Sequence, residues 1–138
     1  MMEAVSKPIE HYVNIFLEFI QAWGRADAEA VASFYTDDLD YRDPSVGLGI
    51  HDKKALIDYL HLMFSVWPKQ EWIPGDLFPH REEGSFTGLY KFKIANDKTE
   101  ISGHGMDMIV FRGDKIWKNY VFLNADKWNT WLKRELGL

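Results

Sequence analysis

The sequence predicts an α+β fold in which an antiparallel sheet curls around helices. Apolar residues recur at helical spacing up to Pro68, and beyond it the pattern changes to the alternation typical of strands. Three expected helices followed by a four-stranded meander are typical of the α+β class. The chain of 138 residues contains no linker, repeat or low-complexity stretch, which predicts a single domain over residues 1–138.

The helical half contains three segments with their own start and stop signals. Pro8 lies near the start of the first helix and Gly24 ends it. Its apolar face is formed by Tyr12, Phe16, Phe19 and Trp23. Asp27 and Asp52 are expected to cap the second and third helices. Pro68 ends the third helix. Residues 36–44, between the second and third helices, are expected to be extended, because a residue before proline avoids the helical region.

The second half contains four expected strands and a closing helix. The strands are Glu71–Glu82, Ser85–Ile94, Glu100–Arg112 and Lys115–Asn124. Short segments of Gly, Asn and Asp between them favour hairpin turns. The amphipathic stretch Lys127–Leu136 predicts a last helix with Trp128, Trp131 and Leu132 on its apolar side.

The composition excludes several classes of protein. The absence of cysteine removes disulfides and thiolate chemistry and suits a reducing compartment, so we expect a cytoplasmic protein. A formal charge of −5 with scattered basic residues argues against nucleic-acid binding. No apolar run approaches the roughly 18 residues that span a bilayer, so no membrane partner is expected. The five histidines lack metal-ligand spacing, so no metal site is expected.

Asp107 is the most informative polar residue. Strand alternation places it on one face with apolar and glycine neighbours, namely Ile101, Gly103, Gly105, Ile109 and Phe111. Glycine within a strand commonly marks a bend or the close approach of another group. A carboxyl group in apolar surroundings has a raised pKa and can carry a proton near neutral pH. Alternatively, Asp107 bonds a backbone group or pairs with a basic side chain.

Asp43 and Asn119 are two further candidates. Asp43 precedes Pro44 where the chain turns, so it is either a catalytic carboxylate or a turn residue that bonds its own backbone. Asn119 is the polar member of a face shared with Trp117, Val121 and Leu123. It could orient a substrate oxygen or satisfy a neighbouring backbone group.

Two surfaces rich in apolar residues are expected. The chain has nine Phe, six Tyr and six Trp, which indicates either a densely packed core or the wall of an apolar pocket. In the last two strands, the faces opposite to Asp107 and Asn119 are too apolar to be exposed to water. They predict a homodimer that forms through the outer face of the sheet. Their residues are Met106, Met108, Val110, Ile116, Tyr120 and Phe122.

Three stretches together resemble the SnoaL-like polyketide cyclase and ketosteroid isomerase families of the nuclear transport factor 2-like superfamily. They cover residues 34–44, Gly103–Phe111 and Lys115–Asn119. The resemblance implies a cone-shaped curved antiparallel sheet around N-terminal helices, with a deep apolar pocket. It implies that Asp43 lies where the isomerases keep a general base, and that Asp107 lies where they keep a protonated carboxylic acid. The SnoaL-like cyclases also use an aspartate in the pocket as an acid/base group. Tyr35 matches a tyrosine of the isomerase hydrogen-bond network.

Two departures from the isomerase pattern change the expected reaction. Phe19 stands where the isomerases have the tyrosine that binds the oxyanion, and Leu60 stands where a second tyrosine lies, with Tyr59 one position away. Because phenylalanine donates no hydrogen bond, a Δ5-3-ketosteroid isomerase is not expected. The pair Asp43 and Asp107 fits proton transfer on another carbonyl or enol substrate.

The expected mechanism is cofactor-free. Asp107 removes a proton next to the carbonyl of a small apolar, polyketide-like substrate, while Asp43 and Asn119 shuttle protons or orient the substrate. The expected binding residues are Phe16, Phe19, Trp23, Tyr35, Phe86, Tyr90, Trp117 and Asn119. One alternative is a non-catalytic module that binds small molecules, and another is a dehydratase, similar to scytalone dehydratase, that uses His80 or His104.

Overall fold

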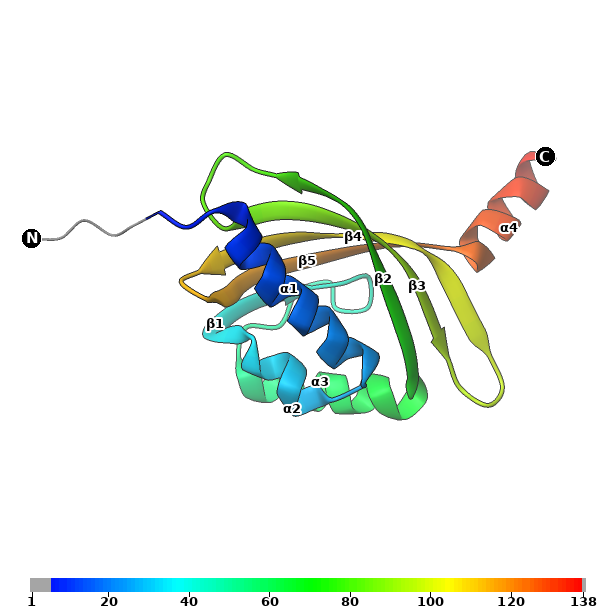
Figure 1. The fold of residues 1–138 in the computed structure, drawn as a ribbon. Coiled ribbons are helices and arrows are strands. Elements are labelled where there is room, and N and C mark those ends of the chain that lie inside the picture. Colours follow the sequence, from blue (N-terminus) through cyan, green and yellow to red (C-terminus); the bar gives the residue numbers. More distant parts are fainter. Residues whose placement is uncertain (1–5, 138) are drawn as a thin grey trace, which may run out of the picture.

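A curled five-stranded sheet covers three helices on its concave side (Figure 1). The computed structural model describes residues 6–137, except for the side chains of residues 125–129 and 132. The elements are α1 (Ile9–Gly24), α2 (Ala28–Ser33), β1 (Tyr35–Arg42), α3 (Lys53–Val66), β2 (Lys69–Pro79), β3 (Ser85–Ala95), β4 (Glu100–Arg112), β5 (Lys115–Ala125) and α4 (Asp126–Leu136).

The predicted helix signals are confirmed. The Asp27 side chain accepts a hydrogen bond from the Ala30 amide at 3.0 Å, and the Asp52 side chain accepts one from the Ala55 amide at 2.8 Å. Both contacts satisfy amide groups that a helix start leaves without partners. These caps fix where α2 and α3 begin, and thereby how they pack beneath the sheet.

The sheet has the order β1-β5-β4-β3-β2. Strands β2 to β5 form the predicted antiparallel meander. The segment predicted as extended is β1, which pairs in parallel with β5 and brings Tyr41 beside Asn119. The sheet is therefore mixed and has one strand more than the predicted meander. Because Tyr35, Leu39 and Tyr41 of β1 are all buried, this strand closes the core at that edge.

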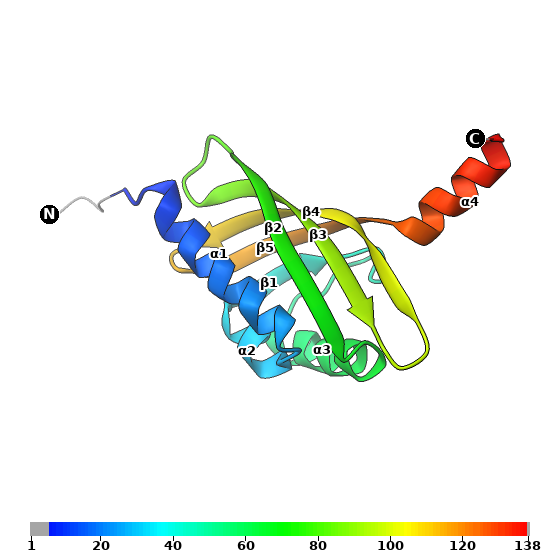
Figure 2. The same ribbon diagram turned by 45° about the vertical axis from the view of Figure 1, so that its right-hand side comes forward.

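Helix α4 projects beyond the sheet, at the end of the molecule opposite to the start of α1 (Figures 1 and 2). Trp131 of this helix is 44% exposed. The predictions for Trp128 and Leu132 fall on side chains outside the described residues. Within residues 6–137, no helix combines the length and apolar character needed to cross a membrane.

Candidate active site

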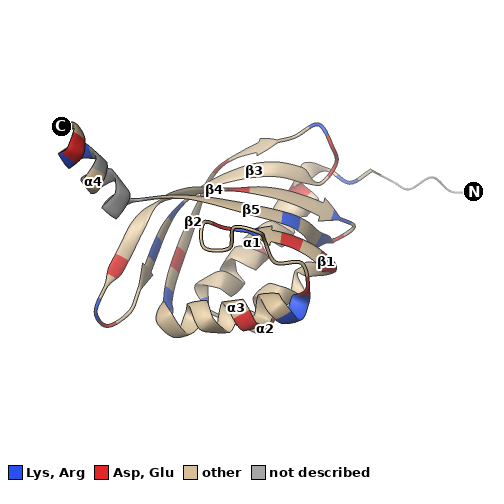
Figure 3. Ribbon diagram, turned by 180° about the vertical axis from the view of Figure 1, so that it is seen from behind, with Lys and Arg blue, Asp and Glu red and all other residues tan. Residues whose placement is uncertain are grey.

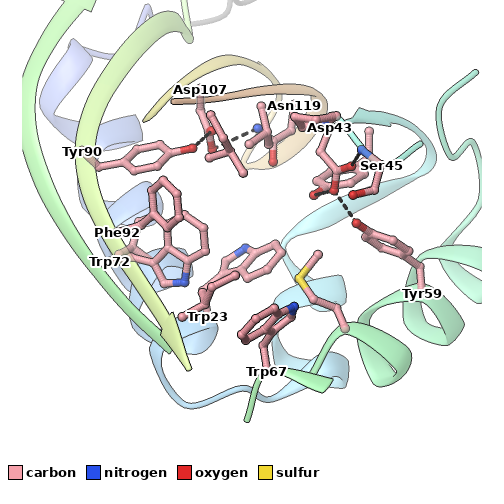
Figure 4. A pocket seen from close by; sticks show the side chains of 17 residues that line it. Trp23, Asp43, Ser45, Tyr59, Trp67, Trp72, Tyr90, Phe92, Asp107 and Asn119 are labelled. Carbon is pink, nitrogen blue, oxygen red and sulfur yellow. Dashed lines mark hydrogen bonds between the residues drawn. The ribbon is translucent and has the colours of Figure 1, made fainter. Parts of the chain in front are cut away.

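A cavity of about 220 Å³ lies between the concave face of the sheet and the helices. Most of its apolar wall is aromatic and comes from Trp23, Trp67, Trp72 and Phe92. Its polar lining includes Tyr41, Asp43, Tyr59, Tyr90, Asp107 and Asn119. Figure 4 shows the two carboxyl groups on one side of this space and the tryptophans on the other.

Asp107 is a buried carboxyl group with two neutral partners. It accepts a hydrogen bond from the Tyr90 hydroxyl at 2.8 Å and one from the Asn119 amide at 3.1 Å. Desolvation raises the pKa of Asp107 to about 6, and the hydrogen bonds from Tyr90 and Asn119 only partly oppose that rise. A pKa near 6 lets this side chain take up and release a proton close to neutral pH.

Asn119 is held in one orientation by the core. The Tyr35 hydroxyl donates to the Asn119 side-chain oxygen at 2.7 Å, so the amide nitrogen faces Asp107. Tyr35 is itself fully buried, and burial raises the pKa of its hydroxyl well above the ordinary value. The hydroxyl therefore stays protonated and keeps the amide of Asn119 aimed at the carboxyl group.

Gly105 explains why glycine stands beside Asp107. The Tyr90 ring lies directly against Gly105, and a side-chain carbon at that position would overlap the ring. The strand pairing sets Tyr90 opposite Gly105, which leaves the hydroxyl within reach of Asp107. The predicted close approach to a strand glycine is confirmed, and the approaching group is the tyrosine that binds the carboxyl group.

Asp43, in the loop after β1, is bound by three donors. The hydroxyls of Tyr41 and Tyr59 donate to one carboxylate oxygen at 2.7 Å and 2.5 Å, and the Ser45 amide donates to the other at 2.6 Å. The Ser45 contact is the turn geometry predicted for an aspartate before proline. Because Asp43 also lines the cavity, the turn and the site share one carboxyl group.

The structure divides the predicted binding residues into two groups. Trp23, Tyr90 and Asn119 line the cavity together with Asp43 and Asp107. The remaining buried ones are packed into the hydrophobic core and do not line the cavity; they are Phe16, Phe19, Tyr35 and Phe86. The helical stripe of aromatic residues is thus partly cavity wall and partly core.

The predicted orientation of Trp117 is wrong. The pairing of β4 with β5 shifts between Val110 and Phe111, and Trp117 is the extra residue. A bulge of this kind reverses the alternation of side chains. Ile116, predicted on the outer face, is therefore fully buried, while Trp117 stacks beneath the Arg112 guanidinium, which lies 4.1 Å from the ring centre.

Several lining residues were not among the predicted ones. Tyr41 precedes Asp43 by two residues, so strand alternation puts both on one face and could have identified it. Trp72 pairs with Phe92 across β2 and β3, and their rings stack. That pairing depends on strand register, which the pattern within one strand does not specify. Tyr59, one position from the expected network site, reaches Asp43 from α3.

The two histidines named for a dehydratase do not line the cavity. His80 contacts the hydroxyls of Ser85 and Thr87 at 2.7 Å and 2.8 Å, near the end of β2. His104 is exposed on the outer face of β4. Among the side chains that the structure describes, no three histidine or acidic groups gather in a way that could hold a metal ion.

Comparison with solved structures supports the same architecture. SalBIII, an epoxide hydrolase/cyclase-like enzyme of pyran ring formation in the polyether salinomycin, matches with a TM-score of 0.75 and 16% identity, over 84% of this chain and 92% of that one. An LEH-like epoxide hydrolase of M. tuberculosis matches with a TM-score of 0.70 and 11% identity, over 83% and 84% of the two chains.

A protein with a ketosteroid isomerase-like fold from Catenulispora acidiphila, in complex with trimethylamine, matches with a TM-score of 0.69 and 12% identity, over 78% of this chain and 82% of that one. No curated protein matches the sequence. The model of the SnoaL-like domain matches residues 16–119, which include both carboxyl groups of the cavity. The chain therefore belongs to the SnoaL-like family, as the three sequence stretches predicted, and it has a ketosteroid isomerase-like fold.

Proposed function

We propose that this chain is a cofactor-free acid/base enzyme that moves a proton next to the carbonyl group of a small apolar, cyclic or polyketide-like substrate. One observation carries the proposal. Asp107 has a pKa of about 6 in an apolar cavity that it shares with a second carboxyl group, Asp43. A base of that pKa, placed on the wall of an apolar cavity, suits the removal of a weakly acidic C–H proton.

The proposed step begins with ionised Asp107. The α C–H bond of the ketone breaks, its proton forms an O–H bond on Asp107, and the electron pair moves to the carbonyl oxygen. The resulting enolate is then consumed by protonation at another carbon, by ring closure or by loss of a leaving group. Asn119 keeps the carboxyl group in place, and Asp43 lies in the same cavity.

The size of the cavity limits the substrate. A cavity of about 150 Å³ holds a benzene molecule, and pockets for drug-sized ligands span roughly 300–1,000 Å³. The observed volume of about 220 Å³ lies between these values. A substrate portion of one or two rings fits this volume, which favours a small cyclic ketone over a steroid.

The alternative functions have less support. A non-catalytic binding module needs no buried carboxyl group with a pKa of about 6 beside its ligand. A dehydratase that relies on His80 or His104 needs one of them in the cavity, and neither is there. The acid/base enzyme is therefore the function that uses the groups the cavity provides.

The test is proton exchange on a small ketone. Loss of the α-hydrogen signals of 2-tetralone and a panel of related one- and two-ring ketones is followed by NMR in D₂O. We expect the protein to accelerate exchange of at least one ketone, and Asp107→Asn to lower that rate by about 10²–10⁴-fold. Asp97→Asn, at a fully exposed turn position, is the matched control. Equal rates for Asp107→Asn and the wild type contradict the proposal, as does the absence of exchange across the whole panel.

We also propose that the protein forms a homodimer through the outer face of the sheet. Leu89, Met106 and Phe122 lie side by side across β3, β4 and β5, and Phe122 is 54% exposed. In Figure 3 most of the central stretch of these strands is uncharged. Light scattering after size exclusion should give twice 16.1 kDa, and Phe122→Glu should give a monomer. A wild-type mass of one chain contradicts the proposal.

A further inference from the structure

The indole N–H of Trp23 is a cavity donor for which the described residues supply no acceptor. Trp23 is only 7% exposed and lines the cavity. Trp72, in the same wall, donates its own N–H to the Gln70 side chain at 2.9 Å. Buried indole N–H groups usually have such a partner. The described residues give no such partner to the N–H groups of Trp23 and Trp67, and of these two side chains Trp23 is the more buried. In Figure 4 the Trp23 nitrogen lies on the ring edge that faces the carboxyl groups.

Neighbouring rings hold this donor in a fixed direction. The Trp23 ring meets Phe64 and Trp72 edge-on, with ring centres 5.4 Å and 5.7 Å away. Phe19, one helical turn earlier, meets it at 6.3 Å and 89°. A ring enclosed on three sides cannot rotate its N–H to another acceptor without repacking the core. The donor is therefore preorganised, which is the property that makes a hydrogen bond to a developing charge effective.

The other side-chain donors of the cavity are largely committed. The hydroxyls of Tyr41 and Tyr59 donate to Asp43, and the hydroxyl of Tyr90 donates to Asp107. Carboxylates accept hydrogen bonds and offer no donor when ionised. A substrate oxygen that enters the cavity therefore needs a donor. The Trp23 N–H is one that the surrounding rings hold in place, on a side chain less exposed than Trp67.

We propose that Trp23 donates a hydrogen bond to the carbonyl oxygen of the substrate and thereby turns its α-carbon toward Asp107. Trp23 lies one helical turn after Phe19, the position whose side chain carries no donor. The indole thus provides, from the same helix face, the hydrogen bond to the oxygen that Phe19 cannot make. The choice of a ketone as ligand rests on the proposed function, whereas the unpartnered donor is independent of it.

The test compares a ketone with its deoxy analogue. Binding of 2-tetralone and of tetralin is measured by calorimetry for the wild type, Trp23→Phe and Trp117→Phe. We expect Trp23→Phe to weaken 2-tetralone binding about 3–10-fold more than tetralin binding, because one hydrogen bond is lost. Trp117→Phe removes an indole N–H outside the cavity and should leave both affinities unchanged. Equal losses for the two ligands, or no loss for either, overturn the proposal.

A second measurement needs no variant at the site. In ¹⁵N-labelled wild-type protein, 2-tetralone should move the Trp23 indole N–H resonance downfield, and tetralin should not. Equal displacement by both ligands overturns the hydrogen bond even if Trp23→Phe fails to fold. Binding is read here without turnover, so binding through Trp23 in the absence of proton exchange would contradict the proposed function and leave this inference intact.

Discussion

The two carboxyl groups of the cavity are built in opposite ways. The partners of Asp107 come from other strands, at separations of 17 residues for Tyr90 and 12 for Asn119. Two of the three partners of Asp43 lie only two residues away along the chain, in Tyr41 and Ser45. The partners of the first carboxyl group are brought together by the sheet, and those of the second lie mainly next to it along the chain.

This difference separates a proton carrier from an anchor. Asp107 is fully enclosed and receives only two hydrogen bonds, which do not offset its desolvation. Asp43 receives three, and a carboxylate has roughly four positions for accepting them. Asp43 therefore has little capacity left for a substrate proton, and its main structural role is to hold the cavity rim to α3 through Tyr59.

Among the experiments that test this difference between Asp107 and Asp43, the largest effect is expected in the pH dependence of proton exchange. Only ionised Asp107 can accept a proton, and its pKa is about 6. The exchange rate of an active ketone should therefore fall about tenfold per pH unit below that value and be roughly 100-fold lower at pH 4. Asp43→Asn should keep the same midpoint. A rate that rises as the pH falls would instead identify Asp107 as the acid.

The second prediction is that Asp107→Asn stabilises the protein above pH 7. Because the pKa of Asp107 rises from 3.8 unfolded to about 6 folded, the unfolded chain loses its proton first, and stability falls between about pH 4 and 6. Asparagine avoids this loss. We expect the free energy of unfolding, measured in urea at pH 8, to rise by about 2 kcal/mol. This gain is smaller than the pKa shift alone would give, because an amide cannot accept hydrogen bonds from both Tyr90 and Asn119. The gain should vanish at pH 4; a variant less stable than the wild type at pH 8 contradicts the role of burial.

Asp107 shows how far sequence alone can lead. Alternation along β4 correctly placed it among apolar neighbours, because a strand buried on one face repeats every two residues. Its partners were not predictable in the same way, since Tyr90 and Asn119 meet it only through the register of three strands. The glycine at position 105 marked a close approach but did not identify the Tyr90 ring.

Trp117 and β1 show where the pattern fails. One extra residue in β5 reverses the side-chain direction, and nothing in the composition of that strand marks the bulge. The parallel pairing of β1 with β5 joins segments far apart in the chain, whereas hairpin turns only specify neighbours. The helix caps, by contrast, depend on residues three positions apart and were predicted correctly.

The third prediction is that Asp43→Asn has the opposite sign to Asp107→Asn. An amide oxygen can still accept the hydroxyls of Tyr41 and Tyr59, but the amide nitrogen then faces the Ser45 N–H, which is also a donor. We expect the free energy of unfolding, measured in urea at pH 8, to fall by about 1 kcal/mol. Asp97→Asn, at the exposed turn, should change little and serves as the control. Stabilisation by Asp43→Asn would mean that the two carboxyl groups do not differ as described.

The smallest expected effect is also the most specific. It comes from removing one tyrosine hydroxyl next to each of the two carboxyl groups. Tyr90→Phe removes a hydrogen bond that lowers the pKa of Asp107, so desolvation should raise that pKa further. The midpoint of the exchange profile should then move up by about half to one pH unit, the equivalent of one hydrogen bond. Tyr59→Phe removes an equivalent bond from Asp43 and should leave the midpoint unchanged. Because both variants lose the same atom next to a carboxyl group, a shift of equal size in both would show that the two groups titrate as one coupled pair. A shift in Tyr90→Phe alone assigns the proton to Asp107.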